Sequence, residues 1–134
     1  MTKIVEIKNI DSPNTQIIGN GDIKSIDEVN KMHKTYNVDG VMIGRGIFMN
    51  PFLFDKSGIK HTPKEYLELL LVHTKKFVEY YGETRNFDDM KKFFKVYVRE
   101  FVGATDLKIK LMETHSYLQI EDIVLKFIKD ENLK

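Results

Sequence analysis

The chain contains no cysteine and only three prolines among its 134 residues. Without cysteine it has no disulfide, no thiolate metal site and no thiol nucleophile. No apolar run approaches the roughly 18 residues that a membrane-spanning helix needs. The first residues also lack the apolar segment of a signal peptide. These absences predict a soluble, cytoplasmic protein that makes no contact with a membrane.

An excess of charge of one sign is also missing, because 21 Lys and Arg stand against 20 Asp and Glu, a net charge of +1. This balance excludes a strongly basic nucleic-acid binder but does not exclude a local basic face. The histidines do not have the mutual spacing of metal ligands, so no metal site is predicted; they are His33, His61, His73 and His115.

Residues 1–60 alternate short apolar runs with amphipathic segments. The runs at 16–19 and 39–44 are bounded by glycine and have the pattern of buried strands. Between them, Ser25 and Glu28 have the spacing of a capping box, which predicts a helix that begins after Ser25. Residues 3–10 have the pattern of the end of another helix. The order helix, strand, helix, strand predicts βα units with parallel strands.

From Thr62 onward the spacing of apolar residues is helical throughout. Thr62 and Pro63 suit the start of a helix, and Gly82 suits its end. Further helices are predicted at 88–103, 104–114 and 118–130, which together would form a four-helix, bundle-like domain. The chain is therefore expected to be α/β over residues 1–55, to have a linker at 56–61, and to be all-α over 62–134.

Two parallel strands cannot by themselves protect both faces and both edges of a sheet. Parallel βα units normally occur in larger sets, with eight of them in a closed (β/α)8 barrel. Residues 1–60 are therefore expected to be the end of a larger α/β unit, and the chain a fragment. Exposed strand edges are expected to drive self-association of such a fragment.

Polar loops that contain glycine follow both predicted strands. Asn20, Gly21 and Asp22 follow the first strand, and Gly44 and Arg45 follow the second. Glycines at such positions let backbone N–H groups approach an anion, and arginine offers a planar fork for phosphate. Each loop alone is well explained as a tight turn. The pair together, each at a transition from strand to helix, predicts a phosphate site like those at the end of many (β/α)8 barrels.

The same residues resemble tRNA-dihydrouridine synthases, flavoenzymes with a (β/α)8 barrel and a C-terminal helical domain. Three segments match, in order and spacing, those on the last two barrel strands of the family: residues 17–23 (IIGNGDI), 39–46 (DGVMIGRG) and 50–54 (NPFLF). The helical domain of the family is matched by Met90, Lys91, Lys92, Tyr97, Gly103, Ala104, Leu107 and Lys108. The resemblance covers essentially the whole chain. It implies that residues 1–55 are the C-terminal βα units of a (β/α)8 TIM barrel, and that the chain is a C-terminal fragment that lacks the N-terminal barrel portion.

The resemblance implies that Asn20, Gly21, Asp22, Gly44 and Arg45 hold the phosphate and the adjoining ribityl chain of FMN. It also implies a reaction, the reduction of uridine in tRNA to 5,6-dihydrouridine with NADPH as the reductant through FMN. In the family a cysteine on an earlier barrel loop is the general acid. Because this chain has no cysteine, it supplies no catalytic residue of that kind and is expected to be inactive alone.

A basic stripe is predicted on the helix at 88–103. Lys91, Lys95 and Arg99 lie at i, i+4 and i+8 with Lys92 beside them, and between residues 91 and 110 six positive charges face two negative ones. A solvated helix face explains such a stripe about as well. Since the helical domain of the family grips tRNA, the resemblance favours contacts from these four residues to RNA phosphates, weak and sensitive to salt in a nearly neutral chain.

One position departs from the family pattern, and alternative functions stay open. Phe93 stands where many family members have histidine, and we interpret it as a core residue of the helix. The main alternative is a non-catalytic RNA- or protein-binding module that uses the helical domain. Another is a different flavin- or phosphate-binding barrel, such as a relative of dihydroorotate dehydrogenase, which the all-helical tail and the segment Asn50–Phe52 disfavour.

Overall fold

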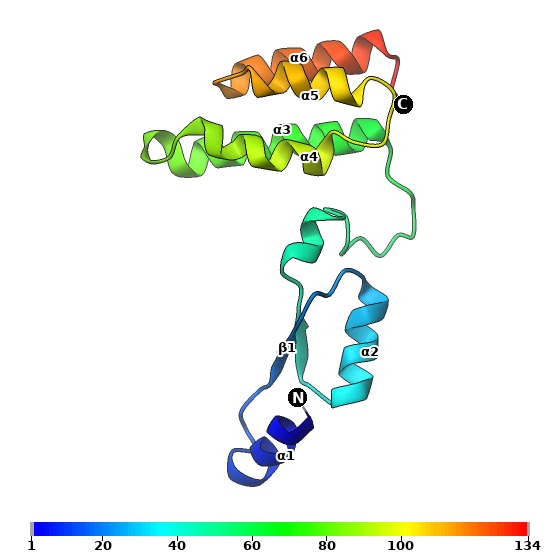
Figure 1. The fold of residues 1–134 in the computed structure, drawn as a ribbon, viewed down its shortest axis with the longest axis vertical. Coiled ribbons are helices and arrows are strands. Elements are labelled where there is room, and N and C mark those ends of the chain that lie inside the picture. Colours follow the sequence, from blue (N-terminus) through cyan, green and yellow to red (C-terminus); the bar gives the residue numbers. More distant parts are fainter. Residues whose placement is uncertain (1, 134) are drawn as a thin grey trace. The chain divides into compact units, whose positions relative to one another are not determined.

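The computed structural model describes residues 2–133 and consists of two compact units that divide between Gly58 and Ile59. In Figure 1 the first unit is coloured blue to teal and the second green to red. The division lies inside the segment 56–61 that the sequence predicts as a linker. Within the described residues, no helix is long and apolar enough to cross a membrane.

The first unit is built on two parallel strands. Its elements are α1 (Thr2–Asp11), β1 (Ile18–Asn20), α2 (Ile26–Tyr36), β2 (Gly40–Met42) and the short 3-10 helix η1 (Arg45–Phe48). β1 and β2 pair in parallel, with Gly19 opposite Val41 and Asn20 opposite Met42. The helix α2 connects the two strands and lies beside them (Figure 1). The predicted βα units with parallel strands are thereby confirmed.

Polar residues set both ends of α2. The Ser25 hydroxyl accepts the N–H of Glu28 at 3.2 Å, as the sequence predicts for a helix start. The Glu28 carboxylate accepts the N–H of Lys24 at 2.6 Å and not that of the N-cap residue Ser25. Only the Ser25 half of the predicted capping box therefore forms. At the other end, Asn37 has a left-handed conformation and donates its N–H to the His33 carbonyl. These caps satisfy backbone groups that an isolated helix would leave unpaired.

Few apolar side chains of the first unit are buried, namely Val5, Ile23, Val38 and Leu53. On the strands, Ile18 is 57% exposed and Met42 is 50% exposed. Apolar residues of parallel strands are normally covered on both faces of the sheet. Self-association through the strand edges remains a prediction, and the exposure of these strand side chains is a reason to test it.

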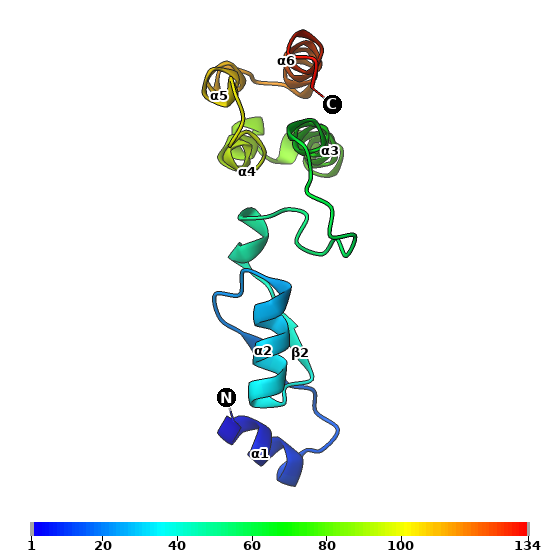
Figure 2. The same cartoon turned by 90° about the vertical axis from the view of Figure 1, so that its right-hand side faces the viewer.

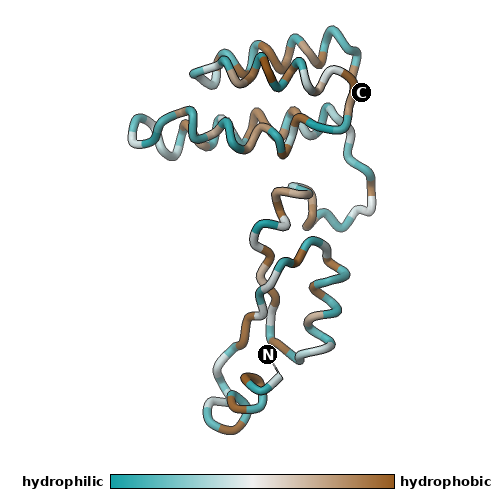
Figure 3. Tube along the Cα trace, in the orientation of Figure 1, coloured by the Kyte–Doolittle hydropathy of each residue, from teal (hydrophilic) through white to brown (hydrophobic). Residues whose placement is uncertain are grey.

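The second unit is helical. It contains α3 (Pro63–Tyr81), α4 (Phe94–Tyr97), α5 (Ala104–Met112) and α6 (Tyr117–Asp130), with the 3-10 helices η2 (Gly82–Thr84) and η3 (Phe87–Phe93) between α3 and α4. In Figure 2 the four α-helices are seen nearly end-on, with α3 beside α4 and α5 beside α6. Hydrophobic and hydrophilic positions alternate along each of them (Figure 3). The residues buried completely in the shared core are Leu67, Leu70, Thr74, Met90, Phe94, Leu111, Ile120 and Val124.

The start of α3 matches its sequence pattern. Thr62 and Glu65 form a complete capping box, in which each side chain accepts the backbone N–H of the other residue. Pro63 occupies the first helical turn, where its missing N–H costs nothing. The helix ends at Gly82, whose positive φ of 50° suits glycine.

The predicted continuous helix over 88–103 is wrong. The chain forms the 3-10 helix η3 and a single α-helical turn, α4, which ends at Tyr97, and residues 98–103 are not helical. The reason is packing, because Val96, Tyr97 and Val98 are all buried. Three consecutive residues of an α-helix spread over about 200° and cannot all face one core. The chain leaves the helix and buries all three.

Candidate phosphate-binding loops and a basic groove

The loops after β1 and β2 lie at the same edge of the sheet, because parallel strands have their carboxyl ends together. They enclose a hollow of about 740 Å³. All five residues that the sequence predicts for phosphate binding line it: Asn20, Gly21, Asp22, Gly44 and Arg45. The hollow is also lined by Ile23, Lys24, Gly46 and Met49. Of these, only Gly46 belonged to the predicted glycine pattern, and nothing marked Lys24 or Met49 beforehand.

A glycine holds the two loops against each other. A Cβ atom built on Gly46 would overlap the carbonyl oxygen of Ile23, so the η1 backbone passes directly against the loop after β1. By contrast, a Cβ on Gly21 or Gly44 would meet no atom within 4 Å. Gly46 therefore serves packing, while Gly21 and Gly44 leave open space where a ligand can approach the backbone.

The charged side chains of the hollow are paired across the two loops. Nη2 of Arg45 donates to Oδ1 of Asp22 at 2.8 Å, and both side chains are more than three-quarters exposed. An ion pair so exposed contributes little to stability. The guanidinium of Arg45 has further N–H groups beyond the one bonded to Asp22. Lys24 also lines the hollow, so the lining carries two cations and one carboxylate. The donor chemistry and the open space at Gly21 and Gly44 therefore fit a phosphate group.

An exposed carboxylate aligns the start of the two strands. Asp39 accepts the N–H of Ile17 at 2.8 Å and lies 3.7 Å from the ammonium of Lys8. The Ile17 N–H, helped by Lys8, holds the pKa of Asp39 below its usual range. The contact joins α1, the residue before β1 and the residue before β2, which sets the strand register that carries the loops.

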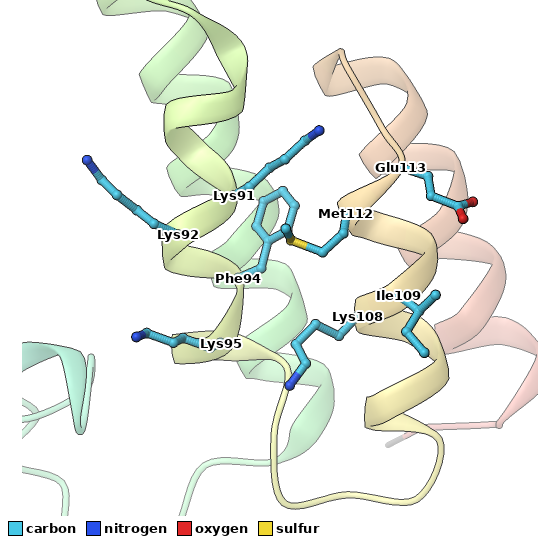
Figure 4. Close-up of a pocket in the computed structure, with 8 residues that line it drawn as sticks. All are labelled: Lys91, Lys92, Phe94, Lys95, Lys108, Ile109, Met112 and Glu113. Atoms are coloured by element: carbon cyan, nitrogen blue, oxygen red, sulfur yellow. The ribbon is translucent and has the colours of Figure 1, made fainter.

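The second candidate site is an open groove of about 590 Å³ between η3 and α4 on one side and α5 on the other. Figure 4 shows its lining residues: Lys91, Lys92, Phe94, Lys95, Lys108, Ile109, Met112 and Glu113. The lysines come from two segments that are separate in the sequence. Because η3, α4 and α5 pack on one core, their positive charges gather at one surface.

The four residues of the predicted basic stripe are not equivalent. Lys92 and Lys95 are exposed, whereas the Lys91 side chain is only 11% exposed and pairs with Asp88 at 2.8 Å. Lys91 and, to a lesser degree, His115 at 3.3 Å hold the pKa of Asp88 below its usual range. Lys91 thus uses its charge in an ion pair within η3 rather than offering a cation to solvent.

Arg99 lies beyond the end of α4 and does not line the groove of Figure 4. It lines an adjoining hollow of about 570 Å³, which is formed by residues 98–102, Ala104, Thr105 and Lys108. The predicted spacing of i, i+4 and i+8 assumed a helix that ends at Tyr97 in the structure. Lys108 lines both hollows and so joins them. Its role went unpredicted, although it was among the six positive charges between residues 91 and 110.

One histidine takes part in the core of the helical unit. Nδ1 of His73 lies 2.7 Å from the Tyr97 hydroxyl, and its ring packs against Phe93 with centroids 5.2 Å apart. Phe93, the last residue of η3, thus packs against α3, as its sequence position suggests. Burial lowers the pKa of His73 and raises the pKa of Tyr97 to about 12. Within residues 2–133, no group of three or more acidic or histidine side chains is placed to hold a metal ion.

Comparison with known proteins gives a consistent result. The family model described as dihydrouridine synthase matches residues 1–131. A probable tRNA-dihydrouridine synthase of Staphylococcus aureus (strain Mu50) is 42% identical over 98% of this chain, and one of Staphylococcus epidermidis (strain RP62A) is 41% identical over 87%. The probable tRNA-dihydrouridine synthase 2 of Bacillus subtilis (strain 168) is 38% identical over 93%.

The chain spans only 36% to 42% of the length of these relatives. The match nevertheless covers both of its units, from the βα loops to the end of the last helix. Family match and sequence identity agree with the resemblance carried by the loop segments, and a (β/α)8 barrel is the fold of that family. The chain therefore belongs to the dihydrouridine synthase family.

Proposed function

We propose that this chain is the part of a tRNA-dihydrouridine synthase that contributes to the FMN phosphate site and grips tRNA. The observation that carries the proposal is the convergence of the two loops after β1 and β2 on one hollow, with Arg45 at its edge and the backbone open at Gly21 and Gly44. The names of the relatives support tRNA as the substrate. The cytoplasm, where tRNA is modified, is the proposed place of action.

Each element of the hollow has a defined task toward the flavin phosphate. Arg45 supplies the cation, and the backbone around Gly21 and Gly44 can approach the phosphate oxygens. Asn20 and Asp22 shape the turn, in which Asp22 has the left-handed φ of 41° that Asp tolerates. A bound FMN would supply the redox chemistry by which NADPH reduces uridine. Because the chain has no cysteine, the proton donor of that reaction has to come from outside it.

The helical unit contributes the affinity for RNA. Lys92, Lys95 and Lys108 line the groove, with the ammonium groups of Lys92 and Lys95 directed outward from it (Figure 4), and Arg99 continues this basic surface beyond α4. Lys91, the other residue of the predicted stripe, acts through its ion pair with Asp88. Contacts of this kind read phosphates and carry no sequence information. The RNA-binding module without catalysis remains the second candidate function, and it rests on this groove alone.

The two functions differ in their response to the flavin phosphate. We would titrate the isotope-labelled chain with FMN and with riboflavin, which lacks the phosphate, and follow the backbone amide signals by NMR. The proposed site predicts saturable shifts at Gly21 and Gly44 with FMN and none with riboflavin. Equal responses to the two flavins would contradict the phosphate site. If neither flavin shifts the amide signals but the chain binds tRNA, the result would support the RNA-binding module.

A further inference from the structure

The groove between α4 and α5 has an apolar floor that phosphate contacts do not need. Ile109 is 57% exposed and Met112 is 48% exposed, although both line the groove. Phe94, which is completely buried, also lines the groove. In Figure 4 the side chains of Phe94 and Met112 point toward each other across the gap between the helices. The groove therefore offers apolar side chains to solvent beside its lysines.

Lysines lie on both sides of the apolar residues of the groove. Lys108 comes from α5, while Lys92 and Lys95 come from the opposite side and point away from α5 in Figure 4. Among the described residues, no carboxylate lies within ion-pair distance of Lys95 or Lys108. Glu113, the one acidic residue of the lining, also points away from the gap. The surface therefore combines unneutralised cations with an apolar centre.

We propose that this groove holds an unpaired nucleotide of the bound RNA, with its base against Met112 and Ile109 and its flanking phosphates at Lys95 and Lys108. The proposal rests on the proposed RNA-binding function and states which feature of the RNA is recognised. Proteins discriminate among RNAs mainly through unpaired bases, which can be splayed out and packed on side chains. A double helix offers phosphates to the lysines but no exposed base face to the floor.

Size and chemistry both fit this occupant. A hollow of about 590 Å³ lies in the usual range of small-ligand sites, about 300 to 1,000 Å³. The thioether of Met112 is polarisable and packs well against the face of a ring system. An apolar helix from a protein partner would cover the floor but leave Lys95 and Lys108 beside it without anions. Charge complementarity therefore favours RNA.

The test compares two RNA probes of equal phosphate number, a hairpin with an unpaired loop and a blunt duplex. Binding of the full chain is measured by fluorescence anisotropy at several salt concentrations. Met112→Gln keeps the side-chain length and makes it polar. Leu125→Gln is the matched control, because Leu125 is 52% exposed on α6 and lies outside the groove. Circular dichroism melting checks that each variant folds.

We expect Met112→Gln to weaken hairpin binding by about three- to tenfold, to leave duplex binding unchanged and to keep the salt dependence of wild type. Met112→Leu should restore most of the loss, and Leu125→Gln should behave as wild type. Equal losses with both probes, or no loss at all, would overturn the proposal. If Met112→Gln unfolds, the hairpin-to-duplex affinity ratio of Ile109→Gln decides by the same criterion.

A separate arm distinguishes failure of the base contact from failure of RNA binding itself. Lys95→Gln and Lys108→Gln should each weaken both probes and reduce the salt slope by about one unit. If these variants behave so while the hairpin has no advantage over the duplex, RNA binding stands and the nucleotide pocket falls. If the wild-type chain binds neither RNA, both proposals fail.

Discussion

The guanidinium of Arg45 lies 2.8 Å from the carboxylate of Asp22, although 23 residues separate the two in the sequence. The pair joins the loop after β1 to the loop after β2 at the edge of the sheet where both strands end. Because both side chains are largely exposed, the ion pair matters for the local charge pattern more than for stability. An incoming phosphate would compete with Asp22 for the same guanidinium.

Replacing Arg45 with alanine should therefore impair phosphate recognition and leave the fold intact. We expect the FMN-induced shifts of the Gly21 and Gly44 amides to disappear in Arg45→Ala, while the melting temperature stays close to that of wild type. Arg85→Ala, a change of the same type in the other unit, is the control. FMN titration curves that coincide for Arg45→Ala and wild type would rule out the phosphate role of Arg45.

Alanine should destabilise the first unit more at Gly46 than at Gly44. Gly46→Ala would place a methyl group on the carbonyl oxygen of Ile23, and this overpacking should destabilise the first unit by about 1 to 3 kcal/mol. Gly44→Ala adds its methyl group where no atom lies within 4 Å, so it should destabilise the unit less than Gly46→Ala. Amide hydrogen exchange of β1 and β2 measures the difference. Similar exchange rates in the two variants would show that the loops do not meet at Gly46.

The lysines of the groove should separate into a structural and a binding class. Lys91→Met removes the ammonium group that most lowers the pKa of Asp88. That pKa should therefore rise toward its ordinary value, and the melting temperature should fall. The salt slope of RNA binding should stay as in wild type, because Lys91 is already neutralised. Lys95→Met should show the reverse pattern. NMR titration of Asp88, melting curves and anisotropy give the three readouts, and a reduced salt slope in Lys91→Met would refute this division.

Acidification should destabilise the helical unit through His73. Its pKa in the folded chain is lowered by burial, below the ordinary value of 6.5, so the unfolded chain binds the proton more readily. The stability that comes from the neutral ring is complete above that ordinary value and is lost as the pH falls through the folded pKa. His73→Gln can keep a hydrogen bond to Tyr97 and does not titrate. Between pH 7.5 and pH 5, we expect the melting temperature of His73→Gln to change less than that of wild type, as followed by circular dichroism. If the melting temperatures of the two proteins fall in parallel with pH, His73 is excluded as the cause.

Local signals in the sequence predicted much of what the structure shows. The Ser25 cap, the helix start at Thr62 and Pro63 and the parallel order of the strands all depend on residues close together in the chain. Such features follow from backbone hydrogen bonding and hydrophobic periodicity. The glycine and arginine of the two loops could be placed at strand ends for the same reason, and the structure puts all five of these residues around one hollow.

The predicted helix over 88–103 failed because burial of side chains, rather than their spacing, determined where the helix ends. The spacing of apolar residues favours a helix through Val98, but burial of three consecutive side chains, Val96 to Val98, is incompatible with one helical face. The end of α4 at Tyr97 then moves Arg99 out of the stripe to which its spacing assigned it.

The resemblance of the loop segments identified the family, while caps and periodicity sufficed for most of the element order and for placing the two glycine-containing loops at the strand ends, because these features depend on neighbours along the chain. Tertiary packing alone decided which lysines face solvent and brought Lys108 of α5 to the groove beside α4. It also closed the contact between Gly46 and Ile23. Distances between side chains on different elements depend on how those elements fill a common core, and no pattern within one element records them.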